Sequence, residues 1–189
     1  MGLELYFLSD PRTSKDASGA LAEEAKIVKS HIPIANLRDL VYRAIYEVGA
    51  RKQKISSLVI SGHGGPHHIT IGTTTLYVQN IPDHAAWLRL LGPLFTRDAV
   101  VTVWGCQCAS TTALLQALSA LWGGVKVQAL TGDITPWSFW IFGDFVGEGD
   151  RTVCVYSNCW VDNSKFDPRD PTGRKGVSNV MSIPPTALF

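Results

Sequence analysis

The sequence predicts an α/β fold, a three-layer α/β/α sandwich with a mostly parallel central sheet. Two observations lead to this prediction. Short strand-like apolar runs alternate along the chain with segments whose apolar residues recur every three or four positions, the spacing of an amphipathic helix. The runs at 55–60, 99–104 and 125–130 are largely apolar rather than alternating, which is typical of parallel strands covered on both faces.

The same patterns predict the elements of the first sixty residues. A strand is expected at 3–8, followed by a polar stretch at 9–18 that is rich in turn-forming residues. The segment 36–48 has apolar residues at helical spacing, with Asn36 placed to cap its start and Gly49 following its predicted end. The strand at 55–60 comes next.

The second half of the chain continues the alternation. Residues 68–71 and 74–78, on either side of Gly72-Thr73, have the pattern of a hairpin. The remaining expected elements are, in order, a helix at 83–91 with Pro93 after it, a strand at 99–104, a helix at 110–122 stopped by Gly123-Gly124, and strands at 125–130 and 152–156. The aromatic segment 137–146 favours neither period.

Composition limits the possible classes of protein. The chain has 189 residues, of which 46% are hydrophobic and 17% charged, as in a globular domain with a core of its own. We expect a folded domain at 1–157 and a polar, Pro-containing C-terminal arm at 158–189. The formal net charge is +1, so charge gives no support for a nucleic-acid or membrane partner, and we expect neither.

Targeting signals and cysteine usage point to a cytoplasmic location. No apolar run approaches the ~20 residues that span a bilayer, and the first residues lack the basic region and cleavage site of a signal peptide. Four cysteines are too few for a disulfide scaffold at this length, and we interpret them as reduced thiols: Cys106, Cys108, Cys154 and Cys159.

Two of the predicted strands end in chemically capable residues. The run at 55–60 leads into Ser61-Gly62-His63-Gly64, and the run at 99–104 leads into Gly105-Cys106-Gln107-Cys108. In parallel sheets, functional residues gather beyond the carboxyl ends of the strands. If the two strands are neighbours, His63 can act on a substrate that Cys106 attacks.

The surroundings of both residues suit acyl-transfer chemistry. Cys106 is expected where a strand stops and a helix begins, and a helix N-terminus favours the thiolate that attacks carbonyl groups. Gly64 lets its own amide approach closely, so the Gly64 and Cys106 amides could hold a developing oxyanion.

These residues resemble the motifs of the caspase-like (clan CD) cysteine peptidases, most of all the bacterial CHAT-like branch. The resemblance covers roughly residues 55–132. It rests on Leu58-Val59-Ile60-Ser61-Gly62-His63-Gly64, Ile71-Gly72, Val103-Trp104-Gly105-Cys106, Ala109 and Val125-Lys126-Val127-Gln128-Ala129-Leu130-Thr131-Gly132. It implies a caspase-like fold for 1–157, a protein or peptide substrate, and a dyad in which Cys106 is the nucleophile and His63 the general acid and base. We expect no cofactor. The second thiol, Cys108, departs from the pattern.

Three alternatives stay open. Cys108 could be the nucleophile, although two residues further along its thiol should turn away from the strand tip. A zinc site could be built from His63, His67, His68, Cys106 and Cys108, although Gly64-Gly65-Pro66 prevents the helix that a His-x3-His pair requires. The chain could also be a caspase-like binding module without turnover.

Substrate recognition is predicted from the segment after the third buried strand, where caspase-like enzymes place substrate-contacting loops. Residues 131–149 include Asp133, Asp144 and Glu148 but no Lys or Arg. An Arg or Lys at the P1 position of the substrate could pair with Asp133 or Asp144, whereas an acidic P1 would find no cation. Alternatively, P1 is apolar and is bound by Trp137 or Trp140, and we therefore include Trp137 among the expected substrate-binding residues.

Overall fold

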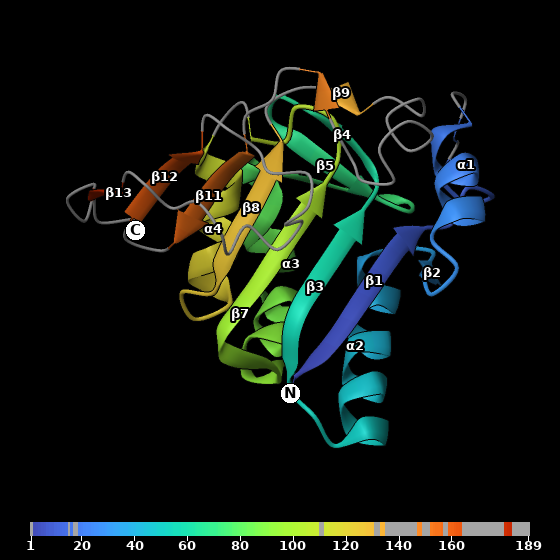
Figure 1. Ribbon diagram of the computed structural model, residues 1–189, viewed down its shortest axis with the longest axis horizontal. Helices are drawn as coiled ribbons and strands as arrows, with labels where there is room; N and C mark the ends of the chain where they lie inside the picture. The colour runs from blue at the N-terminus through green and yellow to red at the C-terminus, as the bar shows by residue number, and fades with distance from the viewer. Residues whose placement is uncertain are drawn as a thin grey trace.

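The computed structural model describes residues 2–14, 16, 19–109 and 112–130, and the backbone of five further strands at 133–134, 147–148, 152–156, 159–163 and 180–182. Its centre is an eight-stranded sheet with the strand order β13-β12-β11-β8-β7-β3-β1-β2 (Figure 1). Five neighbouring strands run parallel: β2 (Ile32–Ile34), β1 (Leu3–Ser9), β3 (Ile55–Ser61), β7 (Phe95–Trp104) and β8 (Lys126–Leu130).

Three antiparallel strands complete the sheet beside β8: β11 (Thr152–Tyr156), β12 (Cys159–Asn163) and β13 (Val180–Ser182). The predicted α/β class with a mostly parallel sheet is therefore confirmed. Because β12 and β13 come from the segment after residue 157, part of the expected C-terminal arm pairs with the sheet. The division of the chain at residue 157 stays a prediction.

Helices lie on both faces of the sheet, which gives the predicted three layers. One face is covered by α2 (Leu37–Arg51), α3 (Ile81–Leu88) and α4 (Thr112–Leu121), which lie together behind the sheet in Figure 1. The opposite face carries α1 (Ala20–Ile27), which contacts β1 through a hydrogen bond from Tyr6 to Glu24. Two short 3-10 helices, η1 (Val78–Asn80) and η2 (Arg89–Leu94), flank α3.

The face under α2, α3 and α4 is apolar in β1, β3, β7 and β8. Because side chains alternate along a strand, the pairing register defines rows of residues that share a face. Two successive rows on this face are Leu5, Leu58, Val101 and Val127, and then Phe7, Ile60, Val103 and Ala129. All eight are buried in one hydrophobic cluster with the helices.

The face toward α1 differs from the prediction that the strands are apolar on both sides. The row between the two apolar rows is Tyr6, Val59, Thr102 and Gln128. The Gln128 Nε2 donates a hydrogen bond of 2.9 Å to Thr102 Oγ1, and both side chains are buried. The buried polar groups of Thr102 and Gln128 thus satisfy one another across two strands, a pairing that neither strand's sequence reveals by itself.

Local signals predict α2 correctly at one end only. The Asn36 side chain accepts a hydrogen bond of 3.0 Å from the Asp39 amide, which is the predicted N-cap. The prediction that the helix stops before Gly49 is wrong, because α2 continues to Arg51 and Lys52 takes the left-handed conformation with φ of 51°. α1 and β2 have no counterpart among the predicted elements.

A small antiparallel sheet lies beyond the tip of β3, formed by β4 (His63–Gly65), β5 (His68–Ile71) and β6 (Thr74–Tyr77). The predicted hairpin is confirmed in β5 and β6. Ser9 fastens this sheet to the central one: its Oγ donates to the Ser61 carbonyl at 2.8 Å and accepts from the Gly72 amide at 3.0 Å. A further strand pair, β9 (Asp133–Ile134) with β10 (Gly147–Glu148), follows β8.

Within the described part of the chain, no helix has both the length and the apolar character that crossing a membrane requires.

Candidate functional site

The tips of β3 and β7 lie side by side at one edge of the sheet. The two strands pair in parallel as far as Ser61 and Trp104, and the Gly62 amide then donates a hydrogen bond of 3.0 Å to the Trp104 carbonyl. His63 and Cys106 each follow their paired strand residue by two positions. The expectation that the two strands are neighbours is confirmed, since β3 and β7 end side by side at one edge of the sheet (Figure 1). His63 and Cys106 therefore both follow at this edge.

Gly64 allows the two tips to approach one another. A Cβ at residue 64 would lie 2.6 Å from the Cys106 carbonyl oxygen and 2.5 Å from the Cys108 Sγ, both closer than a side chain can come. The backbone after His63 therefore packs directly on the backbone around Cys106. The predicted oxyanion donors, the Gly64 and Cys106 amides, belong to these two touching segments, and their role stays a prediction.

Cys106 lies in a turn between β7 and α4. Residues 106–109 form turns, Gln107 has a positive φ of 56°, and α4 begins only at Thr112. Residues 110 and 111, where the sequence predicts that the helix begins, lie outside the described residues. The prediction that a helix N-terminus favours the Cys106 thiolate therefore stays a prediction.

The two thiols of the turn have different surroundings. Cys106 is half-buried, whereas Cys108 is 1% exposed and its Sγ lies 3.5 Å from the His68 carbonyl oxygen. Burial raises the pKa of Cys108 to about 12, and the nearby Cys106 adds to the effect. Cys108 is thus held as a neutral thiol in the packing, and Cys106 is the more exposed of the two thiols.

His63 has a carboxylate partner, Asp16. The His63 Nε2 lies 3.2 Å from Asp16 Oδ1, with 35% of the histidine side chain but only 2% of the aspartate side chain exposed. The angle at Nε2 does not fit a hydrogen bond to Asp16. The ring and the carboxylate are therefore within ion-pair distance of one another without being hydrogen-bonded. The other oxygen, Oδ2, accepts a hydrogen bond of 3.2 Å from the Ala22 amide in the first turn of α1.

A second buried acid, Glu24, lies in the same region. The pKa of Glu24 is raised from 4.5 to about 7, mainly by burial and to a smaller extent by the nearby Asp16, against the hydrogen bonds that favour the charged form. Its Oε1 accepts a hydrogen bond of 2.5 Å from the Tyr6 hydroxyl. Burial also raises the pKa of Tyr6 far above its usual value, so the phenol stays protonated and remains the donor.

Sequence reasoning misses Asp16. It lies in the polar stretch 9–18, which has the composition of a turn region. One signal is available: this stretch follows the end of β1, which is parallel to β3 and therefore ends at the same edge. An acidic residue there is a candidate partner for His63. The contact itself depends on how α1 packs, which no local pattern encodes.

The predicted substrate-binding residues are only partly described. The backbone of Asp133 belongs to β9, which begins shortly after β8 ends and so lies at the same edge as the two tips (Figure 1). Trp137 and Asp144 lie outside the described residues. All three assignments stay predictions.

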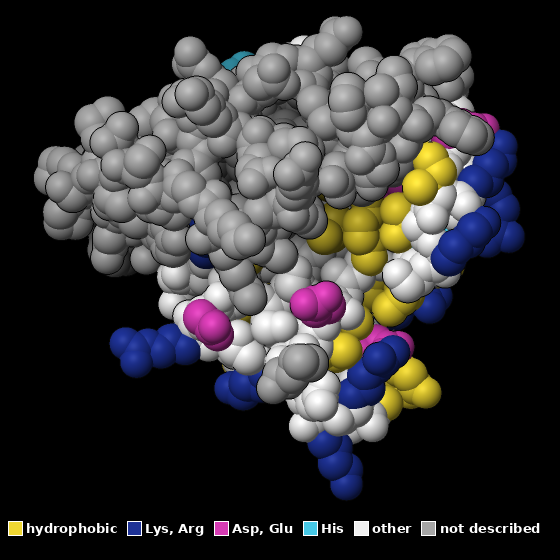
Figure 2. Space-filling model, viewed as in Figure 1, with side chains coloured by type: hydrophobic (Ala, Val, Ile, Leu, Met, Phe, Trp, Pro, Cys, Tyr) yellow, Lys and Arg dark blue, Asp and Glu magenta, His cyan; other side chains and the backbone are white. Residues whose placement is uncertain are grey.

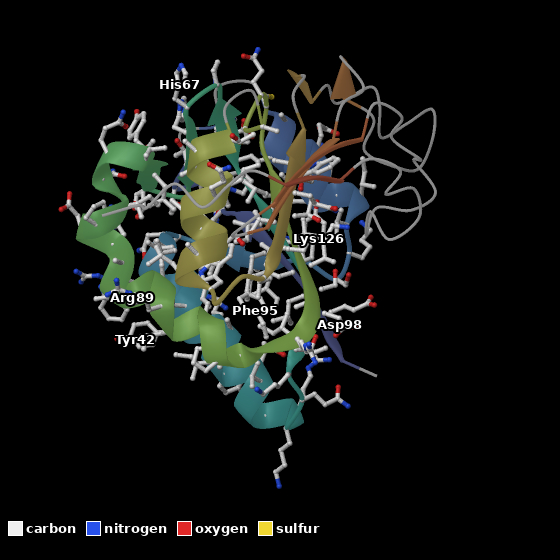
Figure 3. All side chains as sticks on the ribbon, turned by 90° about the vertical axis from the view of Figure 1, so that its left-hand side faces the viewer. Tyr42, His67, Arg89, Phe95, Asp98 and Lys126 are labelled. Atoms are coloured by element: carbon white, nitrogen blue, oxygen red, sulfur yellow. The ribbon has the colours of Figure 1, made fainter. Side chains whose placement is uncertain are left out.

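The zinc alternative gains no support from the described residues, among which no three His, Cys, Asp or Glu side chains are grouped as metal ligands. His67 is exposed and points outward at the end of the molecule (Figure 3). The His68 ring packs against Tyr77, with 5.3 Å between the ring centroids. His67 and His68 therefore point in different directions and have different neighbours.

A cleft of about 690 Å³ opens elsewhere, beside Arg89, Phe95 and Gly124 (Figure 3). Phe95 begins β7 and Cys106 follows its end, so the ten-residue strand separates the two places by roughly 30 Å. This cleft is not part of the His63 and Cys106 site. On the face shown in Figure 2, the Lys and Arg side chains drawn in colour lie along the margins.

The comparisons with known proteins give one match. A family model described as a domain of unknown function (DUF4347) matches residues 16–153, well over half of the chain. The matched segment begins at Asp16 and contains both strand tips. No curated protein and no solved structure matches the chain.

Proposed function

The chain belongs to the DUF4347 family, and we propose that it is a cysteine endopeptidase that hydrolyses peptide bonds with Cys106 and His63. The observation that carries the proposal is the register of β3 and β7. Ser61 of β3 pairs with Trp104 of β7. The partly exposed His63 imidazole and the half-buried Cys106 thiol each belong to the residue two positions beyond this pair, at the same edge of the sheet. A nucleophile and a base held just beyond the ends of two neighbouring strands are the minimum that thiol peptidases require.

In the proposed reaction, the Cys106 sulfur attacks the scissile carbonyl carbon while its proton passes to His63. The carbonyl oxygen becomes an oxyanion beside the touching backbones of Gly64 and Cys106. His63 then gives the proton to the leaving amine as the C–N bond breaks, which leaves a thioester on Cys106. Water hydrolyses the thioester, with His63 as the base, and the free thiol returns.

The difference between the two thiols supports Cys106 as the nucleophile. Cys108 is buried and its raised pKa disfavours the thiolate, so a peptide would meet Cys106 first. We place this chemistry in a reducing, cytoplasmic compartment, because Cys106 must remain a free thiol to act.

We further propose a preference for Arg or Lys at P1. The support is the acidic segment after β8, with Asp133 on the strand β9 and no Lys or Arg at 131–149. An acidic P1 side chain would be left without a cationic partner in such a pocket, which is costly, whereas a basic P1 side chain could pair with an acid of the segment. This difference would favour substrates with Arg or Lys at P1 over those with Asp or Glu.

Labelling with peptidyl acyloxymethyl ketone probes that carry Arg, Asp or Leu at P1 tests both proposals. Intact mass spectrometry should show one adduct on the wild-type protein, fastest with the Arg probe, and peptide mapping should place it on Cys106. Cys106→Ala should abolish the adduct, while the matched control Cys108→Ala should keep it.

Equal labelling of the wild type and Cys106→Ala would reject Cys106 as the nucleophile. Binding of the peptide part of the probe without any adduct would indicate a binding module with no turnover. Faster labelling by the Asp or Leu probe would reject the basic P1 preference and leave the dyad in place.

A further inference from the structure

Asp16 is a buried carboxylate with both oxygens engaged on different elements. Its Oδ2 accepts the Ala22 amide of α1 at 3.2 Å, and its Oδ1 lies 3.2 Å from His63 Nε2. Its own carbonyl accepts a hydrogen bond from the Gly19 amide, which closes the turn that leads into α1. With only 2% of its side chain exposed, the carboxylate depends on these partners in place of water.

The start of α1 fixes the direction in which Asp16 faces His63. A carboxylate at a helix N-terminus is favoured by the free amides and by the helix dipole. Because Oδ2 is held by α1, Oδ1 has one orientation available, toward the imidazole ring. The helix thereby positions a negative charge at one nitrogen of His63, Nε2.

Glu24 limits the negative charge in this region. Its carboxyl is buried, is held by the Tyr6 hydroxyl and has a pKa raised to about 7, partly by Asp16 itself. Below that pH Glu24 is largely protonated, so Asp16 can carry the charge that faces His63 without a second anion beside it.

We propose that Asp16 is a positioning residue for His63, which fixes the ring with its proton on Nε2 and leaves Nδ1 to exchange protons with Cys106 and the substrate. The inference rests on the proposed function for its catalytic consequence, although the ring contact exists without it. It extends the Cys106 and His63 dyad to a third residue, which comes from the loop that leads into the first helix.

The chemical effect follows from the structure of imidazole. A neutral ring has one N–H and one lone pair, so a carboxylate at Nε2 keeps the proton there and makes Nδ1 the acceptor. When Nδ1 takes the proton of the Cys106 thiol, the ring becomes positive, and Asp16 stabilises that charge until the proton passes to the leaving amine. Asp16 itself neither gains nor loses a proton in this scheme.

The test combines turnover with the nitrogen signals of His63. In ¹⁵N-histidine-labelled wild-type protein, long-range ¹H–¹⁵N correlation at high pH should show His63 as the Nε2–H tautomer, with the signals assigned by their loss in His63→Gln. Asp16→Asn should shift the ring toward a mixture of tautomers and lower kcat by about 100-fold or more, with KM little changed.

Asp10→Asn is the matched control. It makes the same chemical change in the same loop, but Asp10 pairs with the exposed Arg12. This control should leave both the tautomer and kcat unchanged.

Each outcome decides between the two proposals. A wild-type His63 in the Nδ1–H form, or ring signals that Asp16→Asn does not move, would overturn the positioning role whatever the turnover. The wild-type spectrum needs no variant, so it remains decisive even if Asp16→Asn does not fold. The Nε2–H tautomer in a protein without any peptidase turnover would keep the positioning role and reject the proposed function.

Discussion

The two faces of the central sheet are formed by the same strands and bury different chemistry. On the side of α2, α3 and α4 the rows across the sheet are entirely apolar, as in Phe7, Ile60, Val103 and Ala129. On the side of α1 the intervening row begins with Tyr6 and ends with the hydrogen-bonded pair of Thr102 and Gln128. The first face is held by area removed from water, the second by specific polar contacts.

The two faces should differ in how well they tolerate substitution. The apolar face can accept other apolar side chains of similar volume, because burial is not directional. The polar face cannot, because its buried groups depend on specific hydrogen-bond partners, as Tyr6 does on Glu24. The candidate site lies at the edge of the sheet, and its carboxylate partner comes from the loop that leads into α1. We therefore expect substitutions on the two faces to have different effects.

The largest effect is expected from a comparison of two adjacent residues of β3. Leu58 is fully buried in the apolar cluster, whereas Val59 is half-buried on the other face. Leu58→Ala should lower the free energy of unfolding by about 2–5 kcal/mol, and Val59→Ala should lower it by clearly less. Urea unfolding followed by circular dichroism measures both. Equal losses would mean that the two faces contribute alike.

The next effect concerns the pH dependence of stability and Glu24. The pKa of Glu24 is raised in the folded protein to about 7, so the folded state binds the proton more tightly than the unfolded state. The resulting stabilisation is fully present below pH 4.5 and is lost as the pH rises through 7. The loss amounts to roughly 3 kcal/mol if the whole shift is realised.

Glu24→Gln removes this titration and should flatten the curve of unfolding free energy against pH between about 4.5 and 7. The matched control is Glu23→Gln on the same helix, where the exposed acid pairs with Lys26, and it should keep the wild-type slope. Urea unfolding at a series of pH values gives the slopes. An unchanged slope in Glu24→Gln would show that Glu24 is not the group responsible.

A smaller effect is expected at Gly64, where the tips of β3 and β7 touch. An added Cβ would meet Cys106 and Cys108, so Gly64→Ala should cost about 1–3 kcal/mol of unfolding free energy through forced displacement. It should also slow probe labelling of Cys106, because the tips must separate.

Gly49→Ala is the matched control, since an added Cβ there has open space and α2 gains a better helix former. It should be neutral or slightly stabilising and should leave labelling unchanged. If Gly64→Ala labelled Cys106 at the wild-type rate, the close approach of the two tips would not be needed for the chemistry.

The parts of the fold that can be predicted from the sequence are those that local patterns encode. The apolar runs of β3 and β7, the turn at Gly72-Thr73 and the Asn36 cap each carry their signal within a few residues. Their parallel pairing then follows from fold class, and it places His63 and Cys106 at one edge.

The missed parts depend on contacts between distant segments. α1 has only eight residues, and one of its two buried side chains is the acid Glu24, so its apolar period is weak. Asp16 gains its importance only when α1 packs on β1 and directs it toward His63.

The most direct test of the central claim is turnover of an internally quenched peptide library by four proteins: the wild type, Cys106→Ala, His63→Ala and the double variant. We predict cleavage by the wild type, losses of at least about 1,000-fold in kcat/KM for each single variant, and no further loss in the double variant, because the two residues act as a unit. Turnover that survives in Cys106→Ala, or losses that multiply in the double variant, would contradict the account.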